Sequence, residues 1–207
     1  MKKSKDLDVH NSFLIFADAK VGEDLLHWLI KNHKKDILAV FTTSQNNIFE
    51  YLKSENIKSF IFKDEESFFN DLSLLNQKPN LGFLLWWPKI ISQKIISSTE
   101  LGFINTHPSL LPYGRGKNPN FWSIVDETPF GVTLHLVHKG IDTGPIIAQK
   151  KIKYTWEDTG ETLYKKALES IIELFKNEYS SIRKFEYDAK KQNPNINNFH
   201  LAKELDP

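Results

Sequence analysis

Short hydrophobic segments alternate with amphipathic ones through the first half of the chain. Segments of this length that are rich in Phe, Ile, Leu and Val are typical of strands buried on both faces of a sheet. Their alternation with helices predicts βαβ units around a parallel sheet. The expected strands are 13–17 (FLIFA), 37–42 (ILAVFT), 59–62 (SFIF), 81–86 (LGFLLW) and 102–105 (GFIN).

The segments between these strands have the periodicity of helices. A hydrophobic stripe at helical spacing follows the first strand, at Leu25, Leu26, Leu29 and Ile30. Residues 46–54 and 65–75 have the same amphipathic character. The first half therefore predicts an α/β fold of the Rossmann-like type, in which helices cover both faces of a mostly parallel twisted sheet.

The second half begins with two segments that can extend this sheet. Residues 132–138 (VTLHLVH) alternate between hydrophobic and polar positions, and 145–152 (PIIAQKKI) follow after a turn rich in glycine. A long amphipathic segment over 159–184 predicts a helix, with Asp158 as its N-cap and Glu161 completing a capping box.

Composition changes along the chain predict one domain and a tail. A chain of 207 residues with 40% hydrophobic residues is long enough for one core and too short for two. Residues 186–207 are polar and rich in asparagine. We therefore expect a domain over 1–185 and a tail over 186–207 that lies on the surface or is partly disordered.

Charge and cysteine content exclude several functions. Lys and Arg number 27 against 26 Asp and Glu, so no global field favours nucleic acid or an anionic membrane. The absence of cysteine rules out a disulfide framework, a thiolate metal site and a catalytic cysteine. No segment approaches the ~20 apolar residues of a membrane span or has the form of a signal peptide, so a cytoplasmic protein is expected.

Candidate chemistry is concentrated at 103–122 (FINTHPSLLPYGRGKNPNFW). If the strand continues, Asn105 and His107 project to the same side, because side chains alternate along a strand. Pro108 favours this geometry by disfavouring helical backbone at the residue before it. Both side chains then lie at the carboxyl end of a strand, where ligands bind in open α/β sheets.

An Asn-x-His pair alone is more often a hydrogen-bonded loop element than a catalytic one. A second turn-rich loop at 141–145 (IDTGP) adds Asp142. In acyl transfer an asparagine can donate to a developing oxyanion, a histidine can hold a proton, and an aspartate can orient that histidine or relay the proton of an attacking amine. The three residue types together therefore favour acyl transfer.

The segments INTHPSLLPYGRG and FGVTLHLVHKGIDTGPIIAQKKI closely resemble the folate-dependent formyltransferase family. This family includes the glycinamide ribonucleotide, methionyl-tRNA and nucleotide-sugar formyltransferases, and the resemblance extends over about 80–175. It implies that Asn105, His107 and Asp142 are the catalytic residues and that 10-formyltetrahydrofolate is the formyl donor. It also implies direct attack of a neutral amine on the formyl carbon, without a metal.

The resemblance further implies where the donor's pterin binds. Two loops should enclose it, one after the strand at 81–86 and one before Asp142. The stretch LLWWPKI is bulkier than the small residues usual in the family, so a bulkier wall of the folate pocket is expected. The expected donor-binding residues are Trp86, Trp87, Pro88, His138, Lys139, Gly140 and Ile141.

The acceptor amine is approached by exclusion. Methionyl-tRNA enzymes of the family carry a further C-terminal domain, which we do not expect here. Glycinamide ribonucleotide enzymes place a glycine-rich phosphate loop after the first strand, whereas this chain has FADAKVGEDLL with Gly22 alone. A dTDP- or GDP-linked amino sugar is therefore the expected acceptor, with glycinamide ribonucleotide or another small amine as the alternative.

Two residues near the catalytic loop are candidate acceptor contacts. Arg115 could grip a diphosphate, although a surface ion pair explains it equally well. Trp122 could stack on a base or sugar, although aromatic side chains more often fill a core. His135 is expected to be a packed or hydrogen-bonded structural histidine.

Two further possibilities stay open at this stage. One is a non-catalytic module that binds folate or a nucleotide sugar, which the complete Asn, His and Asp set disfavours. The other is a homodimer, which exposed edge strands would permit although no residue pattern indicates it.

Overall fold

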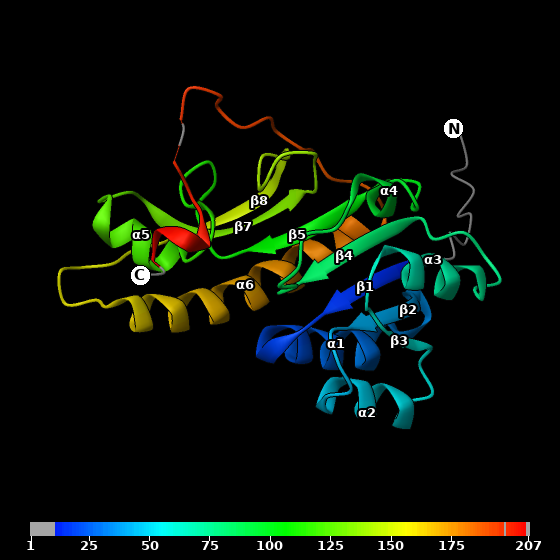
Figure 1. The fold of residues 1–207 in the computed structure, drawn as a ribbon. Helices are drawn as coiled ribbons and strands as arrows, with labels where there is room; N and C mark the ends of the chain where they lie inside the picture. The colour runs from blue at the N-terminus through cyan, green and yellow to red at the C-terminus, as the bar shows by residue number, and fades with distance from the viewer. Residues whose placement is uncertain (1–10, 197, 206–207) are drawn as a thin grey trace, which may run out of the picture.

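The structure is a computed structural model that describes residues 11–196 and 198–205. A seven-stranded sheet with the order β3-β2-β1-β4-β5-β7-β8 runs through it (Figure 1). β1 to β5 are parallel, and β7 pairs antiparallel with β5 and with β8. The strands are β1 Phe13–Ala17, β2 Ile37–Thr42, β3 Ser59–Ile61, β4 Leu81–Leu85, β5 Phe103–His107, β7 Phe130–Leu136 and β8 Ile146–Ile152.

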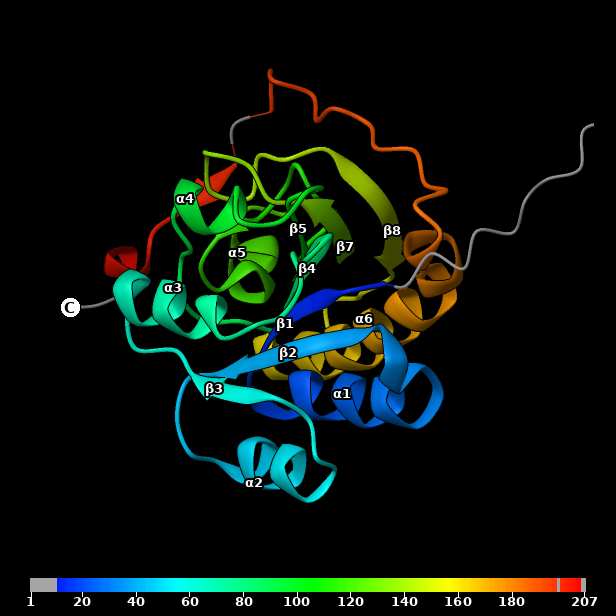
Figure 2. The ribbon, with the colours of Figure 1, turned by 90° about the vertical axis from the view of Figure 1, so that its right-hand side faces the viewer.

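Helices cover both faces of the sheet (Figure 2). α1, α2 and α6 contribute to one hydrophobic core, and α3 and α4 contribute to a second core on the other face. Side chains of the central strand β1 alternate between the two, because successive residues of a strand point to opposite faces. The helices are α1 Ala19–His33, α2 Asn47–Ser54, α3 Glu65–Ser73, α4 Gln93–Ile96, α5 Pro119–Val125 and α6 Gly160–Arg183.

The predicted fold class is confirmed. Each strand expected from the sequence is present, with ends that differ by no more than two residues. All five side chains of β1 are at most 1% exposed, which explains why this strand has a continuous hydrophobic run. Burial of one such side chain stabilises the fold by about 1.5–3 kcal/mol. The edge strands are β3 and β8, and the homodimer that such edges would permit stays a prediction.

The expected cap of the long helix was one residue too early. Thr159, and not Asp158, is the N-cap of α6, and its side chain forms a capping box with Thr162. Asp158 lies in the preceding turn, where its carboxylate accepts hydrogen bonds from the backbone N–H of Thr155 and from Lys166. The Asp158 carboxylate therefore stabilises the turn before the helix and does not cap the helix.

The C-terminal part of the chain, which was expected to lie on the surface or to be partly disordered, pairs with the domain at two places. β9, Phe199–His200, pairs in parallel with β6, Arg115–Gly116, and is followed by the 3₁₀ helix η2, Ala202–Glu204. Upstream, Lys190 forms a bridge with Ile146 in β8. Figure 1 shows this segment passing β7 and β8 at the edge of the sheet and ending beside α5. Backbone hydrogen bonds attach this part of the chain to the domain. Because such bonds need no hydrophobic side chains, the polar composition of 186–207 did not predict the attachment.

A buried carboxylate joins the short 3₁₀ helix after α1 (Lys34–Asp36) to α6. Asp36 is 5% exposed, and its Oδ2 accepts hydrogen bonds from the Tyr179 hydroxyl and from Arg183 Nε, both at 2.9 Å. Its Oδ1 accepts from Asn11 Nδ2 at 3.1 Å. Burial alone would raise the pKa of Asp36, but the hydrogen bonds from Arg183, Asn11 and Tyr179 hold it below its ordinary value.

Replacing Asp36 by alanine is expected to lower the free energy of unfolding by about 1–3 kcal/mol, because buried donors lose their acceptor. Because the pKa of Asp36 in the folded state is below its ordinary value of 3.8, the ionised carboxylate stabilises the protein fully above pH 3.8. This stabilisation is lost as the pH falls through the lowered pKa. The difference between wild type and Asp36→Ala in urea unfolding should therefore shrink in acid. Asp24→Ala, which removes only a surface pair with Lys20, is the control. Equal losses of unfolding free energy for Asp36→Ala and Asp24→Ala would contradict a stabilising role for the buried carboxylate.

Candidate active site

Asn105 and His107 project from β5 toward the same space, as the alternation of the strand predicted. In the antiparallel ladder with β7, Asn105 lies opposite His135, and His107 lies opposite Thr133. His107 is 6% exposed and His135 is 2% exposed. The site therefore lies at the carboxyl end of β5, beside the point where the sheet changes from parallel to antiparallel pairing.

Asp142 reaches the same place from the loop between β7 and β8. Its backbone has a φ of 52°, a left-handed conformation that is uncommon for a residue other than glycine. Its Oδ2 accepts a hydrogen bond from the Gly116 N–H at 3.0 Å, and its backbone carbonyl accepts one from Gln192 Nε2 at 2.7 Å. Two distant segments thus hold the carboxylate in a strained position, as is common at functional sites.

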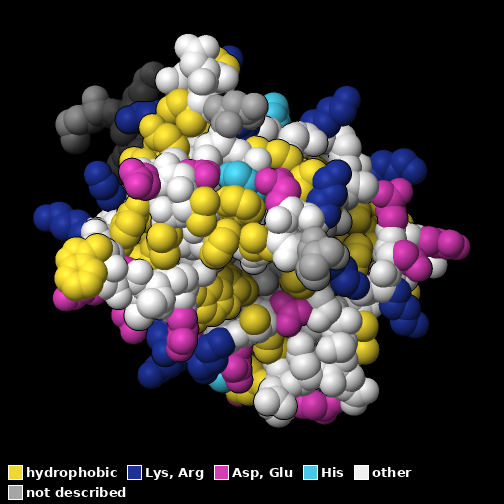
Figure 3. Space-filling model, turned by 60° about the vertical axis from the view of Figure 1, so that its left-hand side comes forward, with side chains coloured by type: hydrophobic (Ala, Val, Ile, Leu, Met, Phe, Trp, Pro, Cys, Tyr) yellow, Lys and Arg dark blue, Asp and Glu magenta, His cyan; other side chains and the backbone are white. Residues whose placement is uncertain are grey.

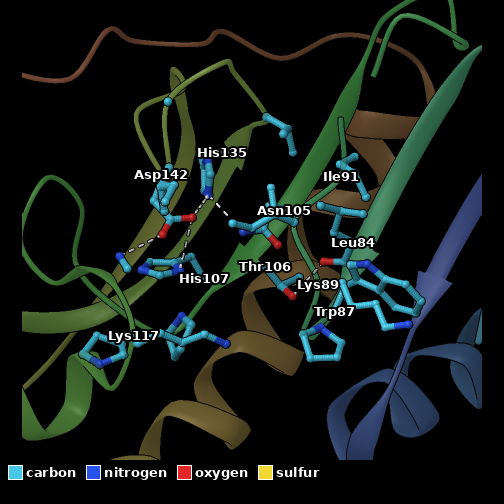
Figure 4. A pocket seen from close by; sticks show the side chains of 18 of the residues that line it. Leu84, Trp87, Lys89, Ile91, Asn105, Thr106, His107, Lys117, His135 and Asp142 are labelled. Carbon is cyan, nitrogen blue, oxygen red and sulfur yellow. Dashed lines mark hydrogen bonds and ion pairs between the residues drawn. The ribbon is translucent and has the colours of Figure 1, made fainter. Parts of the chain in front are cut away.

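The carboxylate faces two histidines. Asp142 Oδ1 lies 3.6 Å from His107 Nδ1 and 3.6 Å from His135 Nε2 (Figure 4). His107 Nε2 lies 3.0 Å from the Gly114 carbonyl oxygen, which can only accept, so Nε2 carries a proton. A second proton on His107 would therefore sit on Nδ1, the nitrogen beside the carboxylate.

His135 is a site residue whose hydrogen-bond partner the sequence did not reveal. Its Nδ1 donates to the Leu136 carbonyl at 2.9 Å, which leaves Nε2 to accept from Asn105 Nδ2 at 3.2 Å. Burial lowers the pKa of His135 to about 4, although the Asp142 carboxylate opposes this shift. A neutral His135 therefore orients the Asn105 amide. The strand pattern placed this histidine on β7 but could not show its partner on β5.

A pocket of about 600 Å³ contains these four side chains. Figure 3 shows hydrophobic side chains gathered around a hollow on this side of the molecule. Figure 4 shows Leu84, Trp87 and Ile91 on one side of Asn105, with His107 and Asp142 on the other. All of the expected donor-binding residues line the pocket, namely Trp86, Trp87, Pro88, His138, Lys139, Gly140 and Ile141.

The other end of the pocket is formed by segments far apart in sequence. Gly116–Asn120 lie on one side, Phe199–Ala202 of the C-terminal part on another, and Tyr164 of α6 projects nearby. The Tyr164 ring lies 5.9 Å from that of Trp86, at an interplanar angle of 64°. The C-terminal contribution was missed in the sequence because it depends on long-range pairing between two strands of two residues each.

The two expected acceptor contacts lie beside this pocket and are not among its lining residues. Arg115 is part of β6, and its Nη2 donates to the Ile196 carbonyl at 3.1 Å. Trp122 stacks on His200, with ring centroids 3.8 Å apart and an interplanar angle of 7°. Both side chains therefore contact the C-terminal part of the chain.

Within residues 11–196 and 198–205, no group of three or more His, Cys, Asp or Glu side chains is arranged to hold a metal ion. None of the helices described there is long and apolar enough to cross a bilayer.

A sequence profile described as formyl transferase matches residues 10–176. The chain therefore belongs to the formyl transferase family. It is 35% identical over 163 residues to the bifunctional polymyxin resistance protein ArnA of Wigglesworthia glossinidia brevipalpis, an alignment that covers 74% of this chain and 25% of that protein. It is 38% identical over 103 residues to the methionyl-tRNA formyltransferase of Thermodesulfovibrio yellowstonii, covering 49% of this chain and 33% of that one. The matched region thus spans a quarter to a third of these relatives.

Solved structures share the fold. The N-formyltransferase of Helicobacter canadensis, in complex with folinic acid and dTDP-3-aminofucose, superposes with a TM-score of 0.78 at 24% sequence identity. The superposition covers 94% of this chain and 72% of that one. At this level of identity the similarity establishes the fold, and the acceptor has to be argued from the site.

Gly144 fixes the loop that carries Asp142. A Cβ atom at this position would lie 1.7 Å from the Leu136 carbonyl oxygen, so the loop approaches β7 more closely than any side chain allows. Gly144→Ala is expected to lower the free energy of unfolding by about 1–3 kcal/mol, as overpacking commonly does. Urea unfolding of Gly144→Ala and Gly160→Ala tests this, because a Cβ at Gly160 meets its nearest atom at 3.7 Å. Comparable stability of both variants would contradict the close approach.

Proposed function

We propose that this protein is an N-formyltransferase that moves a formyl group from 10-formyltetrahydrofolate to the amine of a nucleotide-linked amino sugar. The observation that carries the proposal is the convergence of Asn105, His107 and Asp142 in one pocket, held there by contacts from three separate segments. Family membership supports the reaction class, and the walls of the pocket support the two substrates.

The hydrophobic half of the pocket suits the donor. Leu84, Trp87 and Ile91 belong to the second core and continue into this wall, so its shape is fixed by packing. A flat, partly apolar pterin ring fits such a wall better than a charged sugar nucleotide does. The bound folinic acid of the Helicobacter canadensis enzyme supports a folate at this site. The bulk of Trp86 and Trp87 therefore forms the pocket wall and does not close it.

The donor supplies the formyl group that reacts. A C–N bond forms to the acceptor, the C–N bond to the folate breaks, and one proton moves from the acceptor nitrogen to the folate nitrogen. Asn105 Nδ2 donates one hydrogen to His135 and keeps its second for the developing charge on the formyl oxygen. The positive charge of protonated His107 stabilises the same oxygen, and Asp142 balances that charge and receives the proton of the acceptor amine.

The other half of the pocket suits a phosphorylated acceptor. Lys117 lines the pocket and is exposed, so it can meet a diphosphate without losing its hydration entirely. The dTDP-3-aminofucose of the Helicobacter canadensis enzyme supports a nucleotide-linked amino sugar. Since Arg115 lies outside the lining residues, Lys117 replaces it as the proposed diphosphate contact.

An acceptor panel tests this proposal. Wild-type protein would be incubated with 10-formyltetrahydrofolate and, in turn, dTDP-, GDP- and UDP-linked amino sugars and glycinamide ribonucleotide, while tetrahydrofolate release is followed spectrophotometrically. We expect turnover with an amino-sugar nucleotide. Turnover with glycinamide ribonucleotide alone would overturn the acceptor and keep the reaction, whereas donor binding without turnover on any amine would favour a binding module.

A further inference from the structure

The last described part of the chain, residues 198–205 and here called the C-terminal segment, forms one wall of the pocket. Phe199, His200, Leu201 and Ala202 all line it, on the side proposed above for the acceptor. The segment is only eight residues long, so it has no hydrophobic core of its own. Its position must therefore be set by specific contacts with the rest of the domain.

His200 makes the most informative of these contacts. Its Nε2 lies 2.9 Å from Asp126 Oδ2 at the end of α5, and its Nδ1 lies 2.9 Å from Glu204 Oε2 in η2. Its ring stacks on Trp122. Carboxylates only accept hydrogen bonds, so full use of both contacts requires a proton on each ring nitrogen. The geometry is therefore that of an imidazolium between two carboxylates.

The remaining contacts divide the segment into two parts. The first part is anchored to the domain, because the His200 carbonyl accepts from the Lys117 N–H at 3.0 Å and the Asn198 carbonyl accepts from the Arg115 N–H at 3.1 Å. The Asn198 side chain also accepts from the Gly114 N–H and donates to the Asp126 carboxylate. The second part includes Leu201 and Ala202. Among the hydrogen bonds described for Leu201 to Leu205, all partners lie within the segment, so the pair between His200 and Glu204 links this part to the anchored residues.

We propose that His200, as an imidazolium bridging Asp126 and Glu204, is a positioning residue that holds the C-terminal segment as the acceptor-side wall of the pocket. The proposal rests on the proposed function, which assigns this side of the pocket to the acceptor. It makes affinity for the acceptor, and not for the donor, depend on a side chain that performs no chemistry. Trp122 does not line the pocket, so its ring and the Asp126 carboxylate affect acceptor binding through their contacts with the segment.

A pH dependence follows from the same contacts. The titratable groups that face the ring are Asp126 on α5 and Glu204 on η2. Partial burial opposes the charge of His200, but hydrogen bonds and attraction from Glu204 and Asp126 raise its pKa above the ordinary value of 6.5. A raised pKa means that the contact is fully formed below pH 6.5 and is lost as the pH rises through the raised value.

The test compares His200→Gln with wild type and with His27→Gln, a control on α1 far from the pocket in sequence and fold. Glutamine keeps a polar side chain but cannot donate to both carboxylates with a positive charge. Amide hydrogen exchange of the C-terminal segment, measured at pH 6 and pH 9, reports the contact without any substrate. Steady-state kinetics with the acceptor found in the panel report its consequence.

We expect His200→Gln to exchange faster than wild type in the C-terminal segment at pH 6, with unchanged exchange in the sheet, and the difference to shrink at pH 9. The KM for the acceptor should rise about fivefold to tenfold, the effect of losing a charge-assisted hydrogen bond, while kcat and the KM for the donor stay within about twofold. Equal exchange at pH 6, or equal rises in both KM values, would overturn the proposal. If no amine is formylated by wild type, the proposed function fails and the exchange result alone decides whether His200 holds the segment.

Discussion

Asn105→Ala is expected to lower kcat by about 10²–10³, the cost of removing one donor from an oxyanion site. The side chain is held by His135, which accepts from its Nδ2 at 3.2 Å and stays neutral because burial lowers its pKa to about 4. The amide is thus fixed before substrate arrives, and its stabilisation is exerted mainly in the transition state. The KM for the donor should therefore change by no more than a few-fold.

Rapid-quench measurement of formylated acceptor separates this effect from a folding defect. Asn32→Ala is the matched control, because Asn32 is an exposed asparagine on α1 whose side chain donates to the Trp28 carbonyl. The double variant Asn105→Ala with His107→Ala should lose little more than the more damaging single variant, since the two act on one oxygen. A rate for Asn105→Ala close to wild type would show that the amide does not contact the reacting group.

Asp142→Asn is expected to lower kcat by about 10²–10⁴, the usual contribution of a positioned acid or base. Asparagine keeps the size of the side chain and an oxygen that can still accept from the Gly116 N–H, so the loop should stay in place. The negative charge that lies 3.6 Å from His107 and from His135 is lost. The amine's proton then has no nearby carboxylate to receive it.

Stopped-flow single turnovers with saturating donor and acceptor measure this loss at the chemical step. Asp71→Asn on α3 serves as the control for removal of one negative charge from the protein. A thermal midpoint close to that of wild type would show that the loop is intact. Unchanged single-turnover rates for Asp142→Asn would remove this residue from the proposed chemistry and leave Asn105 and His107 to act without it.

The sheet was predictable because its strands are buried on both faces. The run Phe13–Ala17 can only be continuously hydrophobic if two layers of helices cover it, and both layers are present. The placement of Asn105 and His107 on one side of a strand followed from alternation alone. Their convergence with Asp142 was implied by family resemblance, because nothing local to 141–145 shows which strand the loop approaches.

Features that depend on long-range polar contacts were not predictable. The Asn105 and His135 pair joins residues 30 positions apart across an antiparallel ladder. The sequence did not predict α5, because its Pro119 is typical of a turn. In the structure Pro119 occupies the first helical position, where its missing N–H has no cost. The C-terminal segment joins the pocket through hydrogen bonds and one stacked ring pair whose partners lie far away in the sequence.

Transfer of an isotopically labelled formyl group tests the central claim most directly. The protein would be mixed with donor labelled with ¹³C in its formyl group and with the acceptor found in the panel, and the product nitrogen examined by mass spectrometry and NMR. Wild type is expected to place the label on the acceptor amine in a single turnover, and Asn105→Ala, His107→Ala and Asp142→Asn are expected to form product far more slowly. Label recovered as free formate, or equal transfer by wild type and all three variants, would contradict the account.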